Sequence, residues 1–78
     1  MTSTKQQTAA EAYAARLREC DELVESTRNQ LQVHAARQQG DPKNWGFAGD
    51  LGYVIEQLSY VPASLGDRSA VERNGFKY

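Results

Sequence analysis

The hydrophobic residues of this chain recur at helical spacing along two separate stretches. The first stretch, Thr8 to Gln38, contains no glycine or proline and is rich in residues that favour helices. Eight positions with apolar, small or weakly polar side chains follow one another in alternating steps of three and four. This is the spacing of a coiled-coil seam. They are Ala10, Tyr13, Leu17, Cys20, Val24, Thr27, Leu31 and His34, and we name them the first seam. This spacing predicts one long helix over residues 8–38.

The same spacing returns after a short break. Gly40 favours the end of a helix, and Asp41-Pro42 offers a capping residue followed by a proline, which suits the start of another. Pro62 lacks an N–H and disfavours helix at Val61, so the second helix is expected to end or kink near Tyr60. The second seam comprises Phe47, Leu51, Val54, Leu58, Val61 and Leu65, with Ile55 beside it.

The start of the second helix has two candidate positions because glycines stand at every third position there. Gly46, Gly49 and Gly52 do not form the G-x-G-x-x-G order of a dinucleotide-binding loop, and no strand precedes them. On a helix they would instead leave one side open to the close approach of another backbone. Two starts remain open, one at Asp50 as the N-cap and one further back at Trp45. The second helix therefore covers residues 45–61 or 50–61.

Two seams joined by a short turn predict an all-α fold, an antiparallel helical hairpin within one domain. Residues 1–7 are expected to be flexible. The tail, residues 66–78, is expected to be loosely ordered around one short helical turn. Ser69 to Glu72 would open this turn as a capping box and Asn74-Gly75 would close it, which leaves Phe76 and Tyr78 either to dock or to fray. Because the first helix is longer than the second, part of its seam stays uncovered. Pairing with a second copy into a four-helix bundle would hide it, and a three-helix monomer closed by the tail is the alternative.

One motif resembles a known group of proteins. The stretch from Trp45 to Leu58 contains Trp-Gly, two residues, Gly-Asp-Leu and then spaced aliphatic residues. This pattern is similar to one in small helical-hairpin proteins of phages and integrated mobile elements. The similarity rests on Trp45, Gly46, Gly49, Asp50, Leu51, Val54 and Leu58, all within that stretch. The resemblance implies a hairpin and a setting in mobile DNA, and it implies no activity.

Charge and composition narrow the choice of partners. The formal net charge is −1, and the sequence pI is about 5.7, which argues against broad attraction to nucleic acid or to an anionic membrane. No apolar run approaches the length of a membrane span, and the polar beginning lacks the order of a secretion signal. A single cysteine suits a reducing compartment. A cytoplasmic protein without membrane contact is expected.

The residues that could carry chemistry do not form a recognisable site. His34 and Cys20 are the only residues of their kinds, and about 21 Å of helix would separate them. His34 is expected to form a polar layer in a bundle, and Cys20 a small seam residue. The acidic residues are expected to form a solvated face; they are Glu19, Asp21, Glu22 and Glu25. We therefore expect no enzymatic activity, no metal and no cofactor.

A candidate contact surface lies on the second helix. Tyr53, Gln57 and Tyr60 share a face beside the second seam, and Trp45 stands at the start of the helix. The leading hypothesis is a homodimeric, non-enzymatic module that binds a further protein, as an accessory or regulatory factor of a phage or mobile element. The alternative is a small dimeric regulator that binds nucleic acid. It would use Arg16, Arg28, Arg37 and Lys43.

Overall fold

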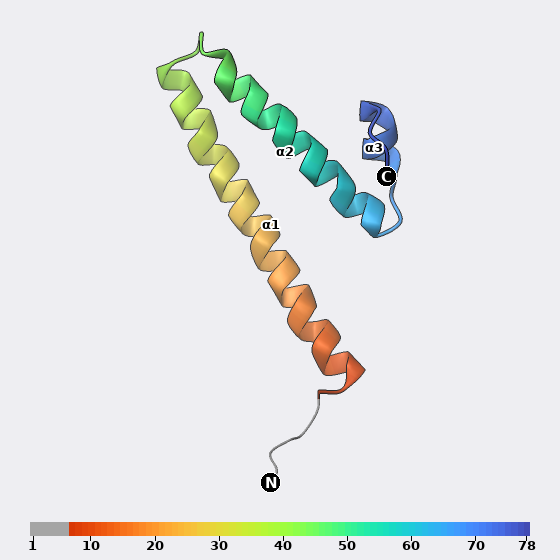
Figure 1. Cartoon of the computed structure of the whole chain (residues 1–78). Helices are drawn as coiled ribbons and strands as arrows, with labels where there is room; N and C mark the ends of the chain where they lie inside the picture. Colours follow the sequence, from red (N-terminus) through yellow and green to blue (C-terminus); the bar gives the residue numbers. More distant parts are fainter. Residues whose placement is uncertain (1–6) are drawn as a thin grey trace. The chain divides into compact units, whose positions relative to one another are not determined.

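The computed structural model describes residues 7–78, and within that range the chain forms helices joined by turns and loops (Figure 1). The helices are α1 (Ala9–Gly40), α2 (Trp45–Ser64) and α3 (Ser69–Asn74). The predicted all-α class is confirmed. The expected flexible N-terminus lies outside the described residues except for its last residue. The chain divides into two compact units, one ending at Arg37 and the other comprising Gln38–Tyr78.

Helix α1 begins with a reciprocal pair of hydrogen bonds. The Glu11 N–H donates to Thr8 Oγ1 at 3.0 Å, and the Thr8 N–H donates to Glu11 Oε1 at 2.9 Å. These bonds form a capping box, which satisfies N–H groups that have no partner within the helix. The helix then continues for 32 residues to Gly40, two residues beyond the predicted end. It is therefore about 48 Å long at the usual rise per residue.

The start of α2 is set by Asn44. Its side-chain Oδ1 accepts a hydrogen bond from the Gly46 N–H at 2.8 Å, so Asn44 is the N-cap and the helix begins at Trp45. Of the two starts left open by the sequence, the one at Trp45 is confirmed and the one at Asp50 is wrong. The expectation that Asp41 would cap α2 is also wrong. Asp41 accepts from the Asn44 Nδ2–H at 3.2 Å and so supports the cap.

Helix α2 passes through Pro62 and ends at Ser64, so the alternative of an end near Tyr60 is wrong and that of a kink there stays a prediction. Pro62 lacks the N–H that a helix would direct at the Leu58 carbonyl, and only two helical residues follow it, so α2 continues for less than one more turn. Its carbonyl accepts from the N–H groups of Leu65 and Asp67, at 3.0 and 2.8 Å. Gly66, at a φ of 106°, then redirects the chain toward α3.

The small core of the second unit lies between α2 and α3. Figure 1 shows α3 beside the C-terminal half of α2. Val71 on α3 is fully buried, and Ser59 and Ala63 are the buried residues of α2. These two small side chains are four positions apart on one face, which lets α3 approach closely. The Ser59 hydroxyl donates to the Ile55 carbonyl at 2.7 Å, so its burial leaves no hydrogen bond unmade.

The C-terminal end of α3 is closed by Gly75, which has a φ of 74°. Its N–H donates to the Glu72 carbonyl at 3.2 Å, and the Phe76 N–H donates to the Val71 carbonyl at 2.8 Å. This is the left-handed cap that glycine adopts readily at the end of a helix. The short turn predicted for the tail is therefore confirmed, including its end at Asn74-Gly75. The cap also directs Phe76 back toward α2.

Candidate interaction surfaces

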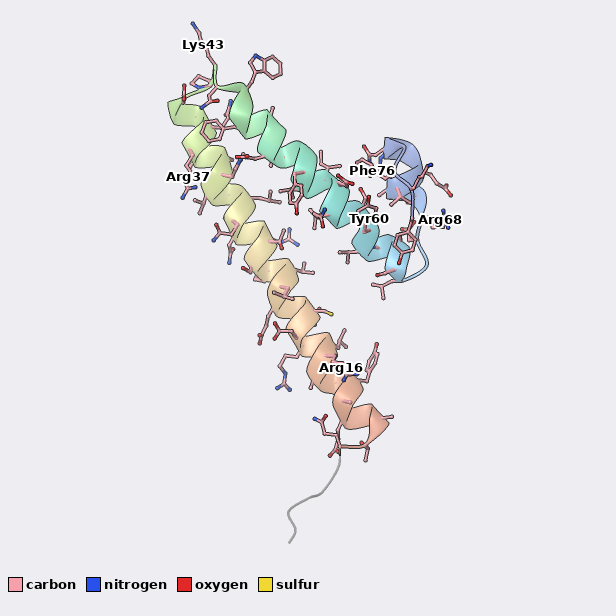
Figure 2. All side chains as sticks on the ribbon, viewed as in Figure 1. Arg16, Arg37, Lys43, Tyr60, Arg68 and Phe76 are labelled. Atoms are coloured by element: carbon pink, nitrogen blue, oxygen red, sulfur yellow. The ribbon has the colours of Figure 1, made fainter. Side chains whose placement is uncertain are left out.

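The first seam is exposed along α1. No residue between Ala9 and Gly40 is buried, and side chains project from the helix along its whole length (Figure 2). Tyr13 is 67% exposed, Leu17 48%, Val24 55% and Leu31 37%. Cys20 is exposed as well, whereas Thr27 and His34 are half-buried. Large apolar side chains on one stripe of a helix are costly to hydrate, so this face is suited to covering by another protein surface.

A polar member of the first seam is already satisfied within its own helix. The Thr27 hydroxyl donates to the Leu23 carbonyl at 2.8 Å. This bond removes much of the cost of covering Thr27, because a buried hydroxyl needs a hydrogen-bond acceptor. The first seam can thus be covered at Thr27 without requiring a polar partner from outside.

The second seam is only partly covered. Phe47 and Val54 are half-buried, whereas Leu51 and Leu58 are about 40% exposed, at 38% and 42%. Val61 and Ile55 are also exposed. Helix α2 therefore presents an apolar stripe of its own, on the residues that the heptad spacing identified.

The predicted contact surface on α2 has an exposed part and an occupied part. Trp45 is 86% exposed and Tyr53 66%, and Gln57 is exposed between them and Tyr60. Tyr60 is half-buried, because its ring lies 6.1 Å from that of Phe76 and 6.2 Å from that of Tyr78, centroid to centroid (Figure 2). We use the name aromatic surface for the exposed residues, Trp45, Tyr53 and Gln57.

The sequence left open whether Phe76 and Tyr78 dock or fray, and the structure shows both rings at Tyr60. Such tilted ring pairs are a common arrangement of aromatic side chains. The Tyr60 hydroxyl donates to Glu56 Oε2 at 2.8 Å, one turn back along α2. This hydrogen bond, together with partial burial and the negative charge of Glu56, raises the pKa of Tyr60. The phenol therefore stays protonated, and its hydrogen bond stays formed, well into the alkaline range.

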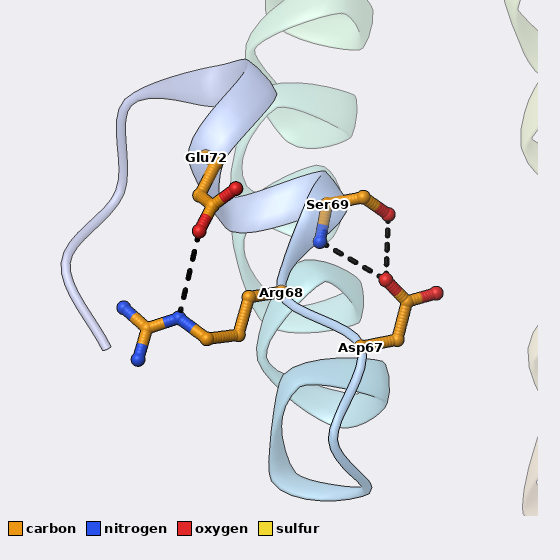
Figure 3. A network of polar contacts seen from close by, with 4 residues as sticks. All are labelled: Asp67, Arg68, Ser69 and Glu72. Carbon is orange, nitrogen blue, oxygen red and sulfur yellow. Dashed lines mark hydrogen bonds and ion pairs between the residues drawn. The ribbon is translucent and has the colours of Figure 1, made fainter.

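The start of α3 is held by Asp67 rather than by a capping box (Figure 3). Asp67 Oδ1 accepts from the Ser69 N–H at 3.0 Å and from the Ser69 hydroxyl at 2.7 Å. In the predicted capping box the Ser69 hydroxyl would accept a hydrogen bond, whereas in the structure it donates one to Asp67. The predicted capping box is therefore wrong. Arg68 Nε lies 3.8 Å from Glu72 Oε2 and forms an exposed ion pair along the same turn.

These bonds change the acidity of Asp67. The hydrogen bond from the Ser69 hydroxyl lowers the pKa of the Asp67 carboxyl, and the bond from the Ser69 N–H lowers it further. Partial loss of hydration acts in the opposite direction, and the positive charge of Arg73 adds a smaller lowering effect. The carboxylate is therefore the form that holds the start of α3.

The basic residues proposed for nucleic-acid binding do not gather on one face of α1. Arg16 and Arg37 lie on one flank of the first seam, near opposite ends of the helix (Figure 2), whereas Arg28 lies on the other flank. Lys43 lies in the turn that follows α1. Nucleic-acid binders concentrate such charges in one stripe or patch.

Two further properties concern the described part of the chain. Residues 7–78 contain no group of three or more His, Cys, Asp or Glu side chains placed to hold a metal ion. None of the helices in the same range combines the length and apolar character needed to cross a lipid bilayer.

Comparison of the sequence with protein-family models and curated proteins, and of the structure with solved structures, finds no match.

Proposed function

We propose that this protein is a non-enzymatic interaction module that binds a second copy of itself and a further protein. The observation that carries the proposal is the first seam, whose large side chains are exposed from Tyr13 to Leu31. A regular stripe of exposed apolar side chains costs free energy when an isolated helix leaves it in water. The same stripe stabilises an assembly in which another surface covers it. The resemblance around Trp45 to proteins of phages and mobile elements supports a role as an accessory or regulatory factor in such an element.

The proposed assembly is built from helical hairpins. Helix α2 folds back on the C-terminal part of α1 so that the two seams meet, and two such hairpins form a four-helix bundle. Because α1 has 32 residues and α2 has 20, about 12 residues at the start of α1 extend beyond the reach of α2. Within the bundle the first seam of each copy also faces that of the other, and at the overhang, which contains Tyr13, Leu17 and Cys20, the second copy is its only cover.

The further protein partner is proposed to bind the aromatic surface. Trp45 and Tyr53 are large and exposed, and residues of these two types often dominate the energetics of protein interfaces. Gln57 provides an amide nearby for hydrogen bonding. The occupied ring of Tyr60 lies at the end of this surface and holds the tail in place.

The test is quantitative capture of partners from a bacterial lysate with the tagged protein. A partner that binds the aromatic surface should be recovered by the natural sequence and lost with Trp45→Ala combined with Tyr53→Ala. The matched control is Gln32→Ala, an exposed polar position outside both surfaces, which should leave recovery unchanged. Equal recovery by all three proteins, or no protein enriched by any of them, would contradict this part of the proposal.

A further inference from the structure

The flanks of the first seam carry information about how a second copy would bind. In a two-stranded coiled coil, the positions on either side of the seam determine which charges meet. One flank of α1 carries Ala9, Arg16, Leu23, Gln30 and Arg37, and we name it the basic flank. The other carries Ala14, Asp21, Arg28 and Ala35, and we name it the mixed flank. Both flanks lie within α1, where no residue is buried.

A parallel, in-register pair satisfies the charges that stand next to the overhang. In this orientation each basic flank meets the mixed flank of the partner helix, five positions further on. Arg16 of each copy then faces Asp21 of the other, so the symmetry gives two opposite-charge contacts. Leu23 faces Arg28 and Gln30 faces Ala35, so no like charges meet along either side.

An antiparallel pair cannot place an acidic residue opposite Arg16. Antiparallel helices bring equivalent flanks together, and the basic flank contains no acidic residue. Arg16 is therefore left without a carboxylate in every antiparallel register. In the register that gives Asp21 a positive partner, Arg28, the other side of the interface places Arg16 against Arg37.

The layers of the seam give a second reason for the parallel orientation. In register, Leu17, Val24 and Leu31 each meet their own counterpart, and so do the polar Thr27 and His34. In the antiparallel register with Asp21 against Arg28, Leu17 instead faces His34 and Val24 faces Thr27. Parallel alignment thus keeps the aliphatic layers together, which strengthens their burial.

We propose that the first seam of α1 is covered by α1 of a second copy, parallel and in register, with Arg16 of each copy beside Asp21 of the other. The inference rests on the proposal that α1 binds another copy of this chain, and it adds the orientation. Because Gln38–Tyr78 follows α1 directly, the two copies of that unit begin at the same end of the pair. Two aromatic surfaces would then be presented together, which favours a partner with two binding sites.

Disulfide mapping tests the orientation. Single cysteines are placed by Tyr13→Cys or by Thr27→Cys, each combined with Cys20→Ser, and the proteins are oxidised mildly. In the proposed pair, each variant forms a disulfide with its own kind, because equal positions face each other. The positions are fourteen residues apart, roughly 21 Å along a helix. No single antiparallel register can therefore bring both pairs of equal positions together.

The control variant is Ala15→Cys with Cys20→Ser, whose thiol lies on the face opposite the first seam. We expect disulfide formation in the Tyr13 and Thr27 variants to be at least about tenfold faster than in this control, because the pair holds facing thiols at a high effective concentration. A mixed disulfide between Leu17→Cys and His34→Cys variants, each combined with Cys20→Ser and identified by mass spectrometry, would show the antiparallel register described above, in which these two positions face each other. That result overturns the orientation and leaves the proposed self-association standing.

A charge exchange provides an independent readout. Arg16→Glu alone and Asp21→Arg alone each place two pairs of like charges across the parallel interface and should weaken association about fivefold. The double variant restores opposite charges and should regain most of the loss. In the antiparallel register described above, Arg16→Glu alone would instead strengthen association, because position 16 faces Arg37. Disulfide formation no faster than in the control, with single-chain mass in solution, would contradict self-association itself and leave the aromatic surface to its own test.

Discussion

At the scale of single residues, the hydrogen bonds around Asp67 determine where α3 begins. Its carboxylate accepts two bonds from Ser69, and these lower its pKa in the folded chain. A group with a lowered folded pKa contributes stability above its ordinary pKa. That contribution is lost as the pH falls through the folded value. We therefore expect α3 to loosen in acid before a comparable helix without such a cap.

Ser69→Ala tests this account. The variant removes the hydroxyl bond and keeps the N–H bond, so the pKa of Asp67 should rise toward the ordinary value for an aspartate. Side-chain carboxyl shifts followed by NMR across the acidic range measure it directly. Ser64→Ala is the control, since that hydroxyl donates only to the Val61 carbonyl and should leave the Asp67 titration unchanged. An unchanged Asp67 titration in the Ser69 variant would refute the assignment.

A second residue-scale prediction concerns the core of the C-terminal unit. Val71 is fully buried, whereas Val61 is 52% exposed, so the same substitution has different consequences at the two sites. Val71→Ala should lower the free energy of local opening by about 2 kcal/mol, from lost burial and the cavity left behind. Val61→Ala should change it by less than about 0.5 kcal/mol.

Amide exchange of Phe76 reads this out, because its N–H is bonded to the Val71 carbonyl. Equal protection of that amide in the two variants would mean that Val71 does not hold the tail.

At the scale of elements, the sequence predicts what depends on spacing and misses what depends on individual caps. The heptad steps give both long helices, because a periodic stripe extends over many residues. The ends of the helices depend on single hydrogen bonds, such as those of Thr8 with Glu11 and of Asn44 with Gly46. Thr8 and Glu11 do have capping-box spacing, so the sequence carries a local signal for the start of α1. Pro62 does not itself end α2, because it stands two residues before the end and removes one hydrogen bond there.

The candidate surfaces also differ in how far the sequence predicts them. The exposed residues of both seams follow from the repeat, whereas the rings around Tyr60 come together through the fold of the tail. Phe76 reaches α2 only because Gly66 and Gly75 both take positive φ values and turn the chain back. No periodicity in the sequence records that path. The Asn74-Gly75 pair was the available signal for its second turn.

The glycines of α2 provide an element-scale prediction. Apart from the adjacent residues and the backbone of α2 itself, no atom of the described chain lies within 4 Å of a methyl group built at Gly49 or Gly52. Gly49→Ala and Gly52→Ala should therefore each stabilise α2 by about 1 kcal/mol, since alanine loses less conformational freedom in a helix. Thermal unfolding followed by circular dichroism measures the change. A loss of stability or of association would show instead that another backbone packs closely against this side of α2, as the glycine spacing first indicated.

At the scale of the whole molecule, the central claim is that a second copy of the chain covers the first seam. Leu17→Glu places a charge in the middle of the overhang, where it would face its counterpart in the second copy. This variant should prevent self-association, because an unpaired charge is costly to bury. Ala15→Glu adds the same charge to the opposite face and should have no effect on mass. Equal behaviour of the two variants would mean that the first seam is not the interface.

The most direct measurement is the molar mass in solution, by light scattering after size-exclusion chromatography over a range of concentrations. One chain has a mass of 8.7 kDa. The account predicts twice that mass at high concentration. The mass should fall toward that of one chain on dilution, because only three of the eight positions of the first seam hold leucine or valine. A mass of one chain at every concentration, with α1 still helical, would contradict it.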